Sequence, residues 1–206
     1  MNRIELYELP AAPGTTPRGT LLVLPGLAVG NFCYAAFRLL HELAAANFCV
    51  VTLPRYRDDD ETGQIEHIKS VIIDEILMGG MVNREQPLSL LGFGRGNHVA
   101  ALAAAGLPAT TQLRRFFWVT PDSPGAPAIA MLRASKDLPG DALFVHFRRQ
   151  PAPPEVTDRY RRFFQRARPA AWRTEYVQFP GDSTQLLSDP QTISAFVGAV
   201  KKFVPC

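Results

Sequence analysis

The chain is poor in cysteine and lacks any apolar run long enough to span a bilayer. Its three cysteines, Cys33, Cys49 and Cys206, stand at unrelated spacings, so we expect free thiols rather than a disulfide framework or a metal knuckle. The longest apolar run, from Leu21 to Val29, is too short for a transmembrane helix. Two acids among the first eight residues exclude the apolar core of a secretory signal. We therefore expect a cytoplasmic protein that does not associate with membranes.

The chain also lacks a strong net charge and any marked bias in composition. Its 206 residues are 47% hydrophobic and 20% charged, which is typical of an ordinary globular protein and predicts one domain over residues 1–206. The formal net charge is only +3. We expect no cofactor. We also expect no metal site, because the dense acidic run from Asp58 to Glu61 precedes a predicted helix, and the dipole of that helix already favours acids at its start.

Basic charge is nevertheless concentrated in one segment. Between Arg148 and Arg173 the chain has eight arginines against two acids, Glu155 and Asp158. The segment is explained either as a solvated helix face or as a surface for an acidic partner or ligand. Nucleic acid is not an expected partner, because the segment carries no matching fold motif and the domain as a whole is not strongly basic.

Apolar runs with the character of buried strands alternate with helical patterns along the chain. The runs are predicted at residues 3–9, 20–24, 48–53, 115–120, 142–147 and 174–179, with one more beginning at Leu88. Such alternation predicts an α/β fold, with a mostly parallel sheet of about seven strands, helices on both faces and right-handed crossovers.

The stretch from Leu88 to Ala100 is the most informative part of the sequence. It joins an apolar run, a glycine-dense turn and an alanine-rich helix without spacers, which predicts a sharp turn from strand to helix. In the G-x-S-x-G nucleophile elbow, glycines flank a strained turn whose apex presents a nucleophile above the sheet. Gly92 and Gly96 occupy the flanking places here, but the apex is Gly94, which has no side chain.

On these motifs the chain resembles the α/β-hydrolase family from about Gly19 to Phe203. Residues 21–27 resemble the family's oxyanion-loop strand, 92–96 its elbow, 143–150 the strand that carries the acid, and 176–183 the strand and loop that carry the histidine. The resemblance implies an α/β-hydrolase fold. The interval between Thr120 and Ala142 leaves no room for a lid domain, so the small, lidless serine hydrolases are the expected relatives in shape.

The same resemblance shows departures at all three catalytic places. The nucleophile place is Gly94, the acid place falls near Gln150, and the histidine place, seven residues before Pro190, falls on Ser183. A triad works as a unit in which the base activates the nucleophile and the acid orients the base. The loss of all three groups predicts a degenerate site and a pseudoenzyme.

Three residues are candidates for relocated chemistry, and each also has an ordinary structural explanation. Asp122 stands where some family members place the acid, but it also suits a turn or a helix N-cap. Cys33 could act as a thiol nucleophile if a helix N-terminus lowered its pKa. His98, one turn into the elbow helix, is expected to face the strand behind it rather than the cleft.

The binding geometry is expected to survive without the triad. The backbone N–H groups of Leu27 and Arg95 would converge as in an oxyanion hole, and the helix dipole would add positive potential beside Gly94. The Arg95 side chain, if it turns inward, would suit a carboxylate or a phosphate. The sequence therefore predicts a non-catalytic protein that binds a small acidic ligand or a protein partner.

Two alternatives remain open. The chain could be an enzyme of this fold, either an esterase or thioesterase with relocated residues or a non-hydrolytic cyclase or lyase. A glycine-rich turn between strand and helix also suggests dinucleotide binding, but Gly92-x-Gly94-x-Gly96 is not the G-x-G-x-x-G fingerprint and does not lie in the first βα unit. About 20 residues further on, Arg114 and Arg115 stand where an acid should hold the ribose.

Overall fold

The computed structural model describes residues 6–24, 26, 32–53, 61–78, 87–108, 113–120, 138, 140–150, 153–166 and 169–204. The strands in these ranges are β1 (Tyr7–Leu9), β2 (Thr20–Leu24), β3 (Cys49–Thr52), β4 (Leu88–Phe93), β5 (Leu113–Thr120), β6 (Asp141–Arg148) and β7 (Thr174–Pro180). The α-helices are α1 (Phe32–Ala35), α2 (Phe37–Ala45), α3 (Glu61–Ser70), α4 (Arg95–Ala105), α6 (Pro154–Arg166) and α7 (Pro190–Phe203).

The strands form one sheet in the order β1-β3-β2-β4-β5-β6-β7. Only β1 is antiparallel to its neighbour, and every other pair of adjacent strands is parallel. The predicted sheet of about seven mostly parallel strands is therefore confirmed. Because the chain moves outward in both directions from β2 and β4, the carboxyl ends of six strands lie along one edge of the sheet, where ligand sites of open α/β sheets are found.

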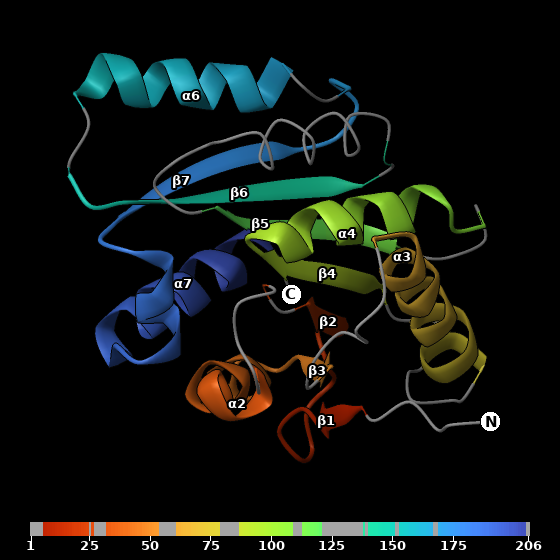
Figure 1. The fold of residues 1–206 in the computed structure, drawn as a ribbon. Helices are drawn as coiled ribbons and strands as arrows, with labels where there is room; N and C mark the ends of the chain where they lie inside the picture. The colour runs from red at the N-terminus through yellow and green to blue at the C-terminus, as the bar shows by residue number, and fades with distance from the viewer. Residues whose placement is uncertain are drawn as a thin grey trace.

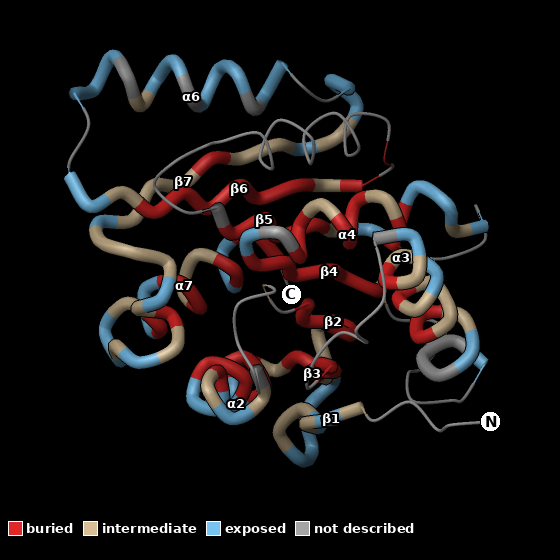
Figure 2. The backbone as a smooth tube through the Cα atoms, in the orientation of Figure 1, coloured by how far each residue is buried: buried red, intermediate tan, exposed pale blue. Residues whose placement is uncertain are grey.

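Helices cover both faces of the sheet (Figure 1). One apolar core lies between the strands and helices α3 and α4, and it includes Ile68 and Val99. The other lies between the strands and helices α2 and α7, and it includes Leu40 and Phe196. With both faces covered, the central strands β2 and β4 are buried along their whole length (Figure 2), which explains their continuous apolar sequences.

Several local features differ from the pattern of the sequence. The helical segment after β2 is interrupted at Ala36, which separates α1 from α2. Helix α3 continues as a π-helix, η1 (Val71–Met78), and a 3₁₀ helix, η2 (Ser183–Leu187), stands between β7 and α7. Almost all of the interval between Thr120 and Ala142, for which no lid is predicted, lies outside the described residues.

Candidate functional site

The turn between β4 and α4 has the geometry of a strained elbow. Gly94 is the N-cap of α4 and has φ 52° and ψ −122°, a conformation that residues with a Cβ rarely adopt. Its N–H donates to the carbonyl oxygen of Val119 at 3.1 Å, and its own carbonyl accepts from the Asn97 N–H at 3.2 Å. The Asn97 side-chain amide also donates to the Val119 carbonyl, at 2.8 Å, so the elbow is fixed to β5.

Two glycines of the elbow serve different purposes. A Cβ at Gly92 would lie 2.4 Å from Asn97 Oδ1 and 2.9 Å from the Asn97 Cα, so the close approach of α4 to β4 requires glycine there. A Cβ at Gly94 would meet no atom of the described residues within 4 Å, and Gly94 is exposed. No described residue therefore fills the side-chain position at the apex.

Only some of the predicted binding residues can be placed. Arg95 begins α4, directly after the apex, as predicted, but its side chain is not described. Leu27 and Asp122 lie outside the described residues. The predicted convergence of the Leu27 and Arg95 N–H groups therefore remains a prediction.

The candidate nucleophile Cys33 does not have the environment that its chemistry needs. It lies in the short helix α1 and is partly buried. Burial raises the pKa of the Cys33 thiol above its ordinary value, outweighing a backbone hydrogen bond that lowers it. A thiol with a raised pKa holds less thiolate at neutral pH, which is the reverse of nucleophile activation.

None of the four histidines lies in the loop that follows β7. His41 lies on α2, where its ring is tilted against that of Phe37 with 4.1 Å between the centroids, and His67 lies on α3. His98 is partly buried on α4, within one turn of the apex. His146 is buried in β6, where its Nδ1 lies 2.8 Å from the Tyr176 hydroxyl.

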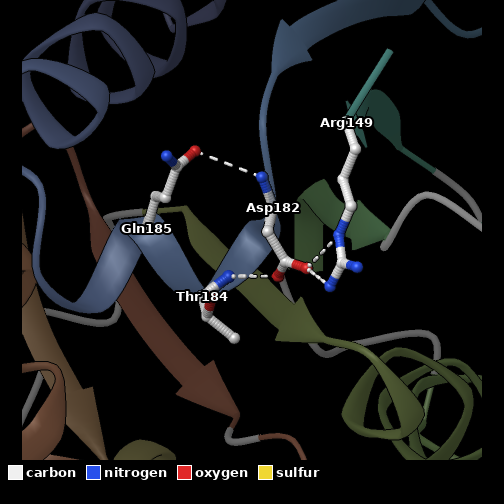
Figure 3. A network of polar contacts seen from close by, with 4 residues as sticks. All are labelled: Arg149, Asp182, Thr184 and Gln185. Atoms are coloured by element: carbon white, nitrogen blue, oxygen red, sulfur yellow. Dashed lines mark hydrogen bonds and ion pairs between the residues drawn. The ribbon is translucent and has the colours of Figure 1, made fainter.

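The loops after β6 and β7 are joined by an ion pair that the sequence analysis did not identify (Figure 3). Arg149 follows β6, and its Nε and Nη2 donate to Oδ2 of Asp182 at 3.2 and 2.7 Å. The other carboxylate oxygen of Asp182 accepts from the Thr184 N–H at 3.0 Å. The Asp182 N–H in turn donates to Gln185 Oε1 at 3.1 Å, which completes a capping box at the start of η2.

This cluster stands at the places that the resemblance assigns to the acid and the histidine. Gln150, the predicted acid place, is exposed in the bend after β6, next to Arg149. Ser183, the predicted histidine place, is the first residue of η2, next to Asp182. A cation from one loop and a carboxylate from the other thus hold the two loops together.

The charge on Asp182 makes this cluster sensitive to pH. The Thr184 N–H, and after it Arg149, lower the pKa of Asp182 below its ordinary value. A carboxyl group with a lowered pKa stabilises the fold above its unfolded-state pKa, and this contribution is lost as the pH falls through the folded-state pKa.

The variant Asp182→Asn keeps the cap and removes the charge. At neutral pH we expect wild type to be more stable than this variant by about 0.5 kcal/mol, because the pair is partly exposed. In urea unfolding, this difference should shrink as the pH falls through the lowered pKa of Asp182. A difference that did not change with pH would show that the carboxylate charge contributes nothing.

Comparison with solved structures identifies the fold. The chain superposes on the esterase Est1E from Butyrivibrio proteoclasticus with a TM-score of 0.67 at 14% identity, covering 96% of this chain and 91% of that one. A monoglyceride lipase variant from Saccharomyces cerevisiae and a dienelactone hydrolase from Anabaena variabilis each give a TM-score of 0.62 at 12% identity, covering 97% of this chain and 90% of theirs. The chain has the α/β-hydrolase fold. No family model matches the sequence, and no curated protein matches it either.

The turn at Gly94 joins β4 to α4 in this fold, and its correspondence to a nucleophile elbow remains a prediction. The described side chains include no group of three or more His, Cys, Asp or Glu residues placed to hold a metal ion, and Asp58 to Asp60 lie outside them. In the described part of the chain, no helix is long and apolar enough to cross a membrane.

Proposed function

We propose that this chain is a non-catalytic α/β-hydrolase-like protein that binds a small acidic ligand at its elbow. The observation that carries the proposal is Gly94, which holds the strained apex conformation and an open side-chain position but has no nucleophile. Gln150 and Ser183, at the other two triad places, supply neither a carboxylate nor an imidazole. Because the members of a triad depend on one another, the absence of all three favours binding over catalysis.

The elbow offers two features that favour an anion. The N–H groups of Arg95 and Gly96 come too early in α4 to have an acceptor within the helix, whereas that of Asn97 donates to the Gly94 carbonyl, and the helix dipole adds positive potential at this end. Arg149 lies at the same edge of the sheet, after β6, and β5 alone separates β6 from β4; because its guanidinium is paired with Asp182, an anion would bind beside that ion pair or displace the carboxylate from it. Two strand spacings amount to roughly 10 Å, a span that a small dicarboxylate or a phosphate ester can bridge.

Ligand binding should therefore raise the melting temperature in a charge-dependent way. We expect succinate, citrate or phenyl phosphate at about ten times its dissociation constant to stabilise the protein by about 1.4 kcal/mol, which corresponds to about 3–5 °C. The shift should weaken as salt is added, because exposed ionic contacts are screened. Differential scanning fluorimetry over a ligand panel, with a neutral ester of each acid for comparison, measures this effect.

Three variants locate the site. Arg95→Ala and Arg149→Gln should each reduce the shift, because each removes a cation beside the elbow. Arg161→Ala is the matched control, since Arg161 pairs with Asp158 on α6, away from the elbow. If no anion in the panel gives a shift, or if Arg161→Ala weakens the shift as much as Arg149→Gln does, the ligand-binding proposal fails.

An enzyme of this fold is the second candidate function. The observation that favours it is the retained strain at Gly94, together with the esterases, lipase and dienelactone hydrolase among the solved structures of similar shape. Such an enzyme would be a hydrolase with relocated residues, for which Asp122 and His98 remain candidates, or a non-hydrolytic cyclase or lyase. Turnover of ester or thioester substrates would favour it over the binding proposal.

A further inference from the structure

Helix α6 presents a continuous exposed face. It runs along β7 at the far end of the sheet (Figure 1), and most of its length is exposed (Figure 2). The Thr157 hydroxyl donates to Gln178 Oε1 on β7 at 3.1 Å, which fixes the side of the helix that faces the sheet. The opposite side is thereby turned to solvent.

Four exposed residues of α6 share that outer side. They are Arg159, Arg162, Phe163 and Arg166, whose spacings of three, four and seven residues place them on one helical face. We call them the arginine face. Phe163, at its centre, is 52% exposed. A large aromatic side chain that is half exposed among arginines is a composition typical of the energetically dominant residues of protein interfaces.

The charge of this face is not neutralised within the described part of the chain. Asp158 pairs with Arg161, whose Nη1 lies 2.6 Å from its carboxylate. Arg162 Nε donates to the backbone carbonyl of Asp158 at 3.3 Å, a contact that leaves its charge uncompensated. None of the three arginines of the face forms an ion pair with a carboxylate of the described residues.

We infer that the arginine face docks an acidic segment of a partner protein, in which carboxylates one helical turn apart flank an apolar side chain that packs on Phe163. Guanidinium groups favour this partner because each can hold a carboxylate with two parallel hydrogen bonds. The inference does not depend on a ligand at the elbow, since it concerns a different surface.

Two features favour a protein over the other polyanions. The chain as a whole carries a formal net charge of only +3, whereas a domain that binds a nucleic acid backbone is typically strongly basic. A helix that lies in a membrane surface needs a broad apolar face, whereas the exposed residues described on α6 include one large apolar side chain, Phe163.

A pair of labelled peptides tests the inference. The first is a helical peptide with glutamates at positions i, i+3 and i+7 around a leucine, and the second has the same composition in permuted order. By fluorescence anisotropy we expect the first to bind the full-length protein at least about tenfold more tightly than the second, because complementarity lies in the spacing as well as the charge. A single-stranded oligonucleotide and vesicles containing phosphatidylserine are run beside them.

Three variants test whether the first peptide binds at the arginine face. The triple variant R159E/R162E/R166E should weaken binding of the first peptide at least about tenfold, and Phe163→Ala should weaken it about threefold or more. The variant K201E/K202E, which reverses two exposed charges on α7, is the matched control and should bind as wild type does. Equal binding of both peptides, no effect of Phe163→Ala, or binding of only the oligonucleotide or the vesicles would overturn the inference.

Discussion

The variant Gly92→Ala is expected to lose about 3 kcal/mol of its free energy of unfolding, the upper part of the range for overpacked cores. The added methyl group would lie 2.4 Å from Asn97 Oδ1, 2.9 Å from the Asn97 Cα and 3.0 Å from its nitrogen. Two of these atoms belong to the backbone of α4, so a side-chain rotation cannot relieve the clash. The helix must move away from β4, which weakens the core that buries Val99. Urea unfolding of both proteins measures the loss.

The variant Gly94→Ala provides the matched comparison, because a Cβ there meets no described atom within 4 Å. Its cost should be only the strain of a Cβ at φ 52°, roughly 1 kcal/mol or a little more. If Gly94→Ala were as damaging as Gly92→Ala, the apex would not be open. If it were neutral or stabilising, the turn would be relaxed and the elbow interpretation would be wrong.

The variant Gly94→Ser is expected to gain no efficient esterase activity. It restores a hydroxyl at the apex, but a serine becomes a strong nucleophile only when a base accepts its proton. The histidine place is Ser183, and none of the four histidines lies in the loop after β7. General-base catalysis contributes about 10²–10⁴ in rate, so the value of kcat/KM for p-nitrophenyl acetate should stay within about tenfold of wild type.

A double variant shows whether Gly94→Ser lacks activity because a base is missing or because the elbow is damaged. Gly94→Ser combined with Ser183→His places a hydroxyl and an imidazole at the two positions that the family resemblance predicts for them, and its rate should exceed that of the single variant. Strong hydrolysis by Gly94→Ser alone would mean that a base already faces the apex, with His98 the first residue to test.

The fold could be predicted from the sequence because its strands are buried on both faces. A strand such as β2, covered by α2 on one side and α3 and α4 on the other, has a continuous apolar sequence that differs from the helical spacing of its neighbours. The turn between β4 and α4 could also be predicted from the sequence, because the close approach at Gly92 and the positive φ at Gly94 both require glycine.

The polar cluster at the other two triad places was not predicted, for a different reason. The capping box has a local signature, since Asp182 and Gln185 are three residues apart, and this pattern could have been found in the sequence. The partner of Asp182, however, is 33 residues away in the chain. Only the pairing of β6 with β7 brings Arg149 to it.

The exposure of individual side chains also depends on tertiary structure. The arginine-rich segment had two sequence explanations, and the choice between them rests on where α6 lies and which carboxylate is already paired. The reactivity of Cys33 likewise follows from burial, which raises its pKa and which no spacing of residues reveals.

The central claim is that the elbow at Gly94 carries no nucleophile, and covalent labelling tests it most directly. Purified wild-type protein is treated with an excess of a fluorophosphonate probe, and its intact mass is measured beside that of an active serine esterase. Because Gly94 offers no hydroxyl at the elbow, the account predicts an unchanged mass for this protein and complete labelling of the esterase. Stoichiometric labelling of any residue of the wild-type chain would contradict it.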